Sequence, residues 1–212
     1  MKKGKKTKSA IMVVLVTMLF CWMVSSSWAI PLVDTGPGPN YTSGVSLYSD
    51  QWVGAEFSLA HNATLTDIYG WIYAQGTAHV GIYSDGGTIP GTELYSSQFS
   101  AAPSLDAAWY GLSGINWYLS SGDYWVTFEV RSGDTMFGAI PPLNGNPPPP
   151  LLKEAFFKTT SGGNFWIPYN SLGLGVRIEG VEGTAQVPEP TTMLLLGLGL
   201  AGLAGVRRKF KE

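Results

Sequence analysis

The chain of 212 residues is poor in cysteine, histidine and charge, and each shortage excludes a class of protein. One cysteine cannot form a disulfide framework, and two histidines are too few for a histidine-based metal site. Charged residues make up 13% of the chain, against about a quarter in an ordinary soluble domain. A coiled coil or helical bundle would need far more Ala, Glu, Lys and Leu. The aromatic content of 13% in turn excludes a charged disordered chain.

The few charges are distributed unevenly along the chain. Nine of the 13 basic residues lie within the first eight or the last six residues. Between residues 30 and 188 there are 4 basic and 13 acidic residues, which is a net charge of −9. A body this acidic repels phosphate backbones, so no nucleic-acid partner is expected.

The N-terminal 29 residues have the pattern of a secretory signal peptide. Five lysines precede an apolar run over residues 10–24, and small residues precede a cleavage site between Ala29 and Ile30. An uncleaved anchor helix is the alternative, but about 20 apolar residues are needed to span a membrane. A lipoprotein signal at Cys21 is disfavoured by the bulky Phe20 before it. We therefore predict export through the inner membrane by the Sec machinery, and a mature protein without cysteine.

The C-terminal end combines three features. A proline-bounded element is followed by an apolar stretch over residues 191–206 and then by a basic cluster. The element is Val187, Pro188, Glu189 and Pro190, and the basic stop is Arg207, Arg208 and Lys209. An apolar stretch ending in a basic cluster is typical of a membrane helix whose charged end stays in the cytoplasm. Sixteen helical residues span about 24 Å, which suits a transient anchor better than a permanent one.

This three-part tail closely resembles the PEP-CTERM sorting signal of Gram-negative bacteria. The resemblance implies recognition by an exosortase, an integral-membrane enzyme that would cut near the Pro-Glu-Pro element. It further implies a transient membrane anchor, a final location at the cell surface or outside the cell, and an association with exopolysaccharide or biofilm matrix.

Between residues 30 and 188, short stretches with the alternating pattern of β-strands are separated by Gly, Pro, Asn, Asp and Ser. We predict an all-β fold: a single β-sandwich of jelly-roll type between the signal peptide and the sorting helix. The expected divisions are 1–29 (signal peptide), 30–180 (sandwich), 181–187 (linker) and 188–212 (sorting segment). The clearest strands are predicted at 51–59, 65–74, 77–83 and 123–131, and weaker ones at 93–99, 114–119, 155–159, 164–169 and 174–179. Residues 30–40 are expected to be irregular.

Parts of this body also resemble the β-sandwich domains found ahead of PEP-CTERM tails. Residues 80–85, 89–91, 94–95 and 119–126 carry this resemblance, which supports the fold and implies no particular chemistry.

Four aromatic residues are candidates for stacking against sugars. Trp71 and Trp125 fall on strand faces opposite the aliphatic or Phe-lined faces, and Tyr69 and Tyr73 flank Trp71. Flat aromatic faces with a polar tip suit carbohydrate binding. The alternative is that both faces of these strands are buried, with the aromatic rings filling the interior.

Catalytic and cofactor signals are weak. No Gly-x-Ser-x-Gly nucleophile motif occurs, and nothing in the sequence selects a pair among the acidic residues. We expect no cofactor, although Asp85, Asp123 and Asp134 lie in glycine-containing turns that suit Ca²⁺. The leading hypothesis is a non-enzymatic exported surface or matrix protein. The alternatives are a carbohydrate-binding module for exopolysaccharide and, behind it, a secreted polysaccharide hydrolase.

Overall fold

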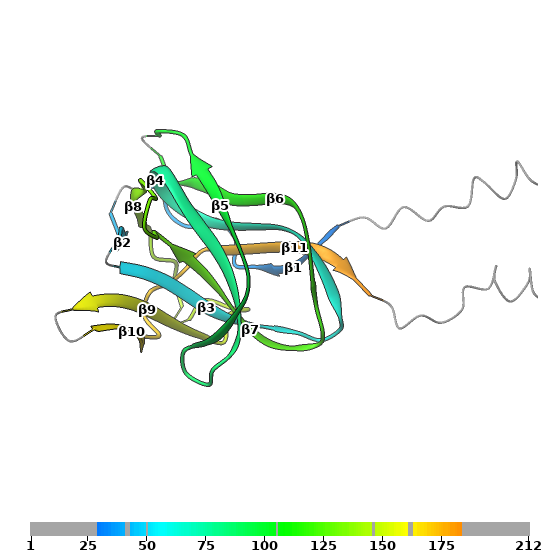
Figure 1. Ribbon diagram of the computed structural model, residues 1–212. Helices are drawn as coiled ribbons and strands as arrows, with labels where there is room; N and C mark the ends of the chain where they lie inside the picture. The colour runs from blue at the N-terminus through cyan, green and yellow to red at the C-terminus, as the bar shows by residue number, and fades with distance from the viewer. Residues whose placement is uncertain are drawn as a thin grey trace, which may run out of the picture.

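The computed structural model describes residues 29–40, 43–49, 51–104, 106–145, 147–160 and 163–183. In these ranges the regular secondary structure is eleven β-strands and no helix, which confirms the predicted all-β class (Figure 1). The strands are β1 (Ile30–Asp34), β2 (Val45–Leu47), β3 (Gln51–Leu59), β4 (Ala63–Asp85), β5 (Pro90–Ala101), β6 (Ala108–Leu119), β7 (Gly122–Glu129), β8 (Phe137–Ile140), β9 (Lys153–Thr160), β10 (Gly163–Pro168) and β11 (Val176–Glu182). The predicted signal peptide and sorting helix lie outside the described residues.

The long strand β4 organises the sheet because its two halves pair with different strands. Residues 63–72 lie between β11 and β6, whereas residues 76–85 lie between β7 and β5. We call β1, β11, the first half of β4 and β6 the terminal half-sheet. We call β5, the second half of β4, β7, β3, β9 and β10 the hairpin half-sheet. One ladder runs through both in the order β1-β11-β4-β7-β3-β9-β10, while β8 pairs with the middle of β4 and with β2.

The two half-sheets pack against each other in a sandwich-like arrangement. Ile68 and Ile72 from one half of β4 and Val80 from the other are fully buried. The Phe128 ring of β7 packs against the terminal half-sheet, because a Cβ added at Gly70 would lie 2.8 Å from two of its carbons. The core therefore lies between the two halves of one strand.

The predicted strand pattern is largely confirmed, with two corrections. Residues 65–74 and 77–83 are parts of the single strand β4, since Gly76 has a φ of +105° and changes the chain direction without ending the strand. The segment 30–40 is not wholly irregular: β1 occupies its first five residues and pairs with β11. Pro31 obscured this strand in the sequence, although proline is tolerated on an edge strand.

The two ends of the described domain are neighbours. Ile30 lies opposite Gly180 in the β1–β11 ladder, and the Gly183 N–H donates to the Asn62 carbonyl oxygen at 2.7 Å. In Figure 1 the start of β1 and the end of β11 lie on the same side of the domain, and the β9–β10 hairpin lies at the opposite side. Val181 and Glu182, expected in the linker, belong to β11. None of the residues that the structure describes form a helix long and apolar enough to cross a membrane.

Candidate functional site

The four aromatic residues predicted to bind sugar do not form one surface. Tyr69, Trp71 and Tyr73 lie in the first half of β4 or at its bend, and Trp71 is opposite Trp109 of β6. Trp125 lies in β7, opposite Glu56 of β3 and Tyr83 in the second half of β4. The tryptophans therefore belong to the outer faces of different half-sheets.

Trp125 is completely buried, so the prediction that it offers an exposed stacking surface is wrong. Contacts between distant segments cross this face next to Trp125. Lys153 of β9 donates from its Nζ to Oε1 of Glu56, which lies opposite Trp125, at 3.0 Å and to the Gly87 carbonyl oxygen at 2.7 Å, and so links the turn after β4 to β9. The alternative prediction, burial of both strand faces, holds for β7. The Trp125 indole N–H has no hydrogen-bond partner in the described structure.

Trp71 is half-buried beneath the segment that follows β1. Its indole N–H donates to the Pro39 carbonyl oxygen at 3.1 Å, and a Cβ added at Gly38 would lie 2.8 Å from its Cδ1. Its ring meets Trp109 edge to face, with centroids 5.4 Å apart. Trp71 thus holds the N-terminal segment against the sheet.

The two tyrosines near Trp71 are also half-buried. The Tyr69 hydroxyl donates to Asp67 Oδ1 at 3.2 Å, and burial together with this carboxylate raises the pKa of Tyr69. Tyr73 lies at the bend of β4, opposite Ala139 of β8. A sugar-binding role for these side chains stays a prediction.

A row of small residues crosses the outer face of the hairpin half-sheet. Thr127 of β7 lies between Gly54 and Gly81, and Gly54 is opposite Ala155 on its other side. A Cβ at Gly54 would lie 3.5 Å from Trp166 Cη2, and one at Gly81 would lie 2.8 Å from Tyr83 Cε2. The missing side chains therefore leave room for two aromatic rings above the backbone.

These rings belong to a cluster that sequence reasoning missed. Trp52 stacks on Phe157 at 4.1 Å with an interplanar angle of 11°, and Trp166 meets both rings edge to face. Tyr83 meets Trp166 at 6.5 Å. We call Trp52, Tyr83, Phe157 and Trp166 the aromatic cluster; all four are half-buried. The outward position of Trp52, which alternates with buried Val53 and Ala55, was the signal available in the sequence.

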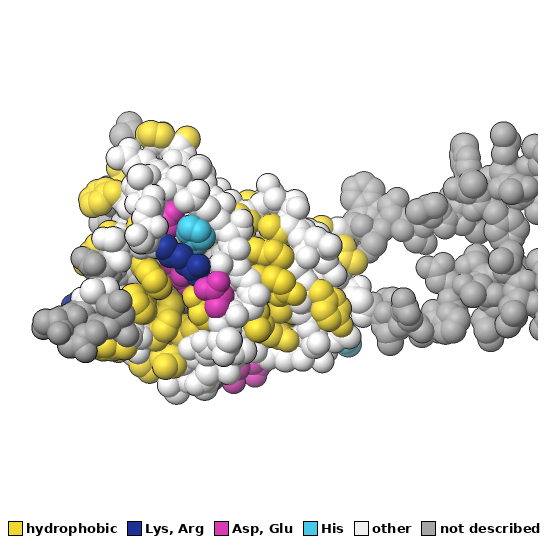
Figure 2. Space-filling model, in the orientation of Figure 1, with side chains coloured by type: hydrophobic (Ala, Val, Ile, Leu, Met, Phe, Trp, Pro, Cys, Tyr) yellow, Lys and Arg dark blue, Asp and Glu magenta, His cyan; other side chains and the backbone are white. Residues whose placement is uncertain are grey.

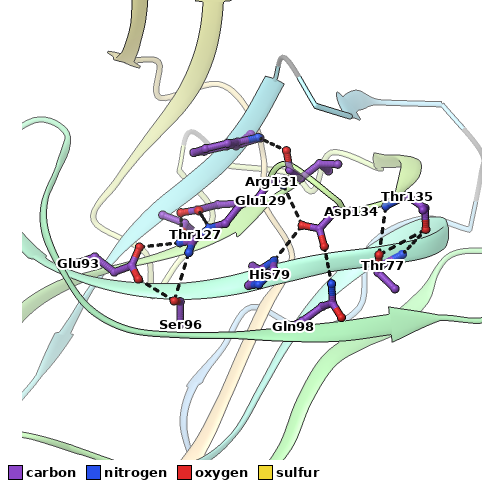
Figure 3. Close-up of polar contacts among 12 residues, drawn as sticks. Thr77, His79, Glu93, Ser96, Gln98, Thr127, Glu129, Arg131, Asp134 and Thr135 are labelled. Carbon is purple, nitrogen blue, oxygen red and sulfur yellow. Dashed lines mark hydrogen bonds and ion pairs between the residues drawn. The ribbon is translucent and has the colours of Figure 1, made fainter.

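A charged network borders the aromatic cluster (Figure 3). The buried Glu129 accepts from the Thr127 hydroxyl and from Arg131 Nε, each at 2.6 Å. Arg131 Nη2 donates to Glu93 Oε2, also at 2.6 Å, and its Nη1 donates to the Ser96 hydroxyl at 3.2 Å. Burial raises the pKa of Tyr83, and the nearby Glu129 raises it further. We call Glu93, Glu129 and Arg131 the ionic network.

Asp134 extends this arrangement past the end of β7. Its Oδ2 lies 2.8 Å from His79 Nδ1 and accepts from the Arg131 backbone N–H, while its Oδ1 accepts from Gln98. Burial opposes ionisation, but these hydrogen bonds outweigh it and lower the pKa of Asp134. Both carboxylate oxygens of this predicted calcium ligand therefore have protein donors.

The other predicted calcium ligands lie at the opposite end of β7. Asp123 is near its start, opposite Ser58, and Asp85 forms the expected turn by accepting from the Gly87 N–H at 2.7 Å. Among the described residues no group of three His, Cys, Asp or Glu side chains is placed to hold a metal ion.

Fold and tail together define an exported all-β domain with a C-terminal sorting segment. Residues 186–209 match the PEP-CTERM protein-sorting motif, which confirms the resemblance drawn from Pro188, Glu189 and Pro190. The motif marks an exported protein whose membrane-anchored sorting signal is processed by an exosortase. It lies outside the described residues. No curated protein and no solved structure matches the chain.

Proposed function

We propose that this protein is a non-enzymatic component of the cell surface or extracellular matrix, associated with exopolysaccharide. A signal peptide over residues 1–29 directs export, and an exosortase releases the domain from a C-terminal membrane helix by cleavage near Pro188-Glu189-Pro190. The match of residues 186–209 to the sorting motif is the observation that carries this proposal.

The strand pairing supports a jelly roll as the exported domain. Four strands of the terminal half-sheet follow the order β1-β11-β4-β6, and four of the hairpin half-sheet follow β5-β4-β7-β3. Among these eight segments, neighbours along the chain alternate between the half-sheets except for the second half of β4 and β5, which form a hairpin within one half-sheet, as in a jelly roll of two Greek keys. On this assignment β9 and β10 are an added hairpin.

The state of the buried carboxylates supports a role in binding or structure rather than catalysis. Glu56 and Glu129 are almost fully buried and are held by Lys153 and Arg131. Glu154 is also buried, and it accepts from the backbone N–H groups of residues 172–174. A hydrolase needs carboxylates that reach the substrate, whereas these three side chains bind other parts of the fold.

The positions of the chain ends support release by processing at one side. Gly183 is still hydrogen-bonded to the domain, and four residues separate it from Pro188. At ~3.5 Å per residue, a fully extended chain from Gly183 to Pro188 spans at most about 18 Å. Before cleavage the domain would therefore be held close to the membrane by its terminal half-sheet.

Mass spectrometry of the mature protein, from host cells with and without the exosortase, tests the proposal. We expect an N-terminus at Ile30 and a C-terminus near Pro188-Glu189-Pro190 when the enzyme is present. Substitution of both Pro188 and Pro190 by alanine should leave the precursor in the inner membrane, whereas Pro37→Ala, at an exposed proline of the domain, should not. A mature protein that retains Arg207 and Phe210 in the presence of the exosortase would contradict the proposal.

A further inference from the structure

We propose that the aromatic cluster of Trp52, Tyr83, Phe157 and Trp166 binds an uncharged polysaccharide chain. The inference rests on the matrix role proposed above and names the surface and the class of ligand for it. It replaces the fully buried Trp125 with a set of rings that reach the surface.

The first argument is the shape and composition of the surface. Trp52 and Phe157 stack in parallel, whereas Trp166 is inclined by 64° to both of them. Two ring orientations next to each other form an angled apolar surface, and the exposed parts of these rings can cover the apolar faces of successive sugar units. Figure 2 shows hydrophobic side chains beside the Arg, His and acidic groups on this side of the molecule.

The second argument is the polar rim. Glu93 has 39% of its side chain exposed, Arg131 25% and His79 23%. The Tyr83 hydroxyl, which donates to Glu93 at 3.0 Å, joins this rim to the aromatic cluster. Arg131 holds Glu93, and Asp134 holds His79, before any ligand arrives. Little ordering is therefore required when the exposed Glu93 carboxylate accepts hydrogen bonds from sugar hydroxyls.

The third argument is charge, and it selects an uncharged ligand. Arg131 directs Nε to Glu129, Nη2 to Glu93 and Nη1 to Ser96, so each of its nitrogens already has a partner and two carboxylates balance its charge. The net charge of −9 over residues 30–188 repels uronic acids, sulfates and phosphates. A neutral polysaccharide is not repelled in this way.

The fourth argument is location. The β9–β10 hairpin, which supplies Phe157 and Trp166, lies at the side of the domain opposite the start of β1 and the end of β11 (Figure 1). A domain held to the membrane by its terminal half-sheet would therefore direct the aromatic cluster away from the lipid. This position favours a ligand in the matrix over a membrane surface.

Affinity electrophoresis of the mature protein in gels containing single polysaccharides tests the inference. The neutral probes are dextran, pullulan, laminarin and galactomannan, and the anionic probe is alginate. We expect retardation by at least one neutral polymer and none by alginate. Trp166→Ala should weaken the binding by about tenfold or more, as expected for the loss of one stacked ring.

Two control variants keep this test specific. Phe165→Ala changes the neighbouring residue of β10, which is 45% exposed, and Tyr118→Ala removes a 53% exposed ring from the terminal half-sheet. Both variants should bind within about twofold of the unsubstituted protein, because neither ring belongs to the aromatic cluster. A twofold change in affinity is small beside the tenfold change that corresponds to 1.4 kcal/mol. Trp166→Tyr keeps an aromatic ring and should bind more tightly than Trp166→Ala; it also serves if the alanine variant does not fold.

Three results would overturn the inference: no retardation by any neutral polymer, retardation that both Trp166 variants leave unchanged, or preferential binding of alginate. These failures are distinct from a failure of sorting, because mass spectrometry measures processing independently of any ligand.

Discussion

The outer faces of the two half-sheets both carry tryptophan, arginine and acidic side chains, yet they use them differently. On the terminal half-sheet, Arg177 lies over the Trp109 ring at 4.5 Å and pairs with Asp34, and both charged side chains remain about 30% exposed. On the hairpin half-sheet, Glu129 is completely buried beneath Arg131. The same residue types thus form a solvated pair on one face and a buried pair on the other.

The difference follows from what covers each face. The segment after β1 covers Trp71 with backbone, through Gly38 and the Pro39 carbonyl, and leaves nearby charges in water. On the hairpin half-sheet, side chains from β9 and β10 and the turn after β4 cover the sheet, so its polar groups had to find partners within the protein. Whether a face is buried is therefore decided by distant segments rather than by its own strand.

The largest expected effect is the loss of Trp125. Trp125→Ala removes a fully buried indole from the covered face and should lower the free energy of unfolding by about 3–5 kcal/mol. Trp71→Ala removes a half-buried ring and one hydrogen bond, which should cost roughly 1–2 kcal/mol. Urea unfolding of the mature protein measures both. Equal losses would break the contrast between the two faces.

The second-largest loss of stability is expected from removal of Arg131. Arg131→Met leaves the buried Glu129 carboxylate without its cation, and breaking a buried pair in this way costs about 3 kcal/mol or more. Because the cost comes from the charge left behind, adding Glu129→Gln to Arg131→Met should restore part of the stability. Chemical denaturation of the single and double variants tests this. A double variant less stable than Arg131→Met would show that the pair acts in some other way.

The inner faces of the strands were readable from the sequence, and the outer faces were not. Alternation placed Ala78, Val80 and Ile82 on one face, and all three are buried. The turn at Asp85 was also predicted, because Asp followed by two glycines favours an Asx turn with a positive φ, here +92° at Gly87. Such features depend on residues close together in the chain.

Burial of the outer faces depends on contacts that no local pattern encodes. Lys153, 28 positions after Trp125, links Glu56, which lies opposite Trp125, to the turn after β4, and Arg131 binds Glu93, 38 positions earlier. The strand at Ile30 exists because β11 pairs with it from the other end of the domain. The aromatic cluster likewise joins β3, β4, β9 and β10, so it could not be assembled from any single segment.

The contribution of Asp134 to stability depends on pH and should be smaller than the loss caused by Arg131→Met. Its folded-state pKa is lowered from 3.8, so its stabilisation is present above about pH 4 and is lost as the pH falls through the lowered value. At pH 7, Asp134→Asn should cost about 1–2 kcal/mol through weaker hydrogen bonds to His79, Gln98 and the Arg131 N–H. Unfolding curves of both proteins at pH 7 and near pH 3 should show the difference shrinking. A difference that stays constant between these pH values would mean that ionisation of Asp134 does not contribute.

The smallest expected effect is on the solvated face. Arg177→Met removes an ion pair with Asp34 that is about 30% exposed on both sides, and exposed pairs contribute about 1 kcal/mol or less. The cation–π contact with Trp109 adds an amount of similar size, about 0.5–1 kcal/mol, part of which the methionine side chain retains by packing on the ring. The loss should therefore stay near 1 kcal/mol and decrease in high salt, because salt screens exposed charges. The loss caused by Arg131→Met should change little with salt, since the Glu129 left behind is buried. If denaturation at low and high salt showed the same dependence for both variants, the two arginines would share one environment, and covering by distant segments would not explain the difference between the faces.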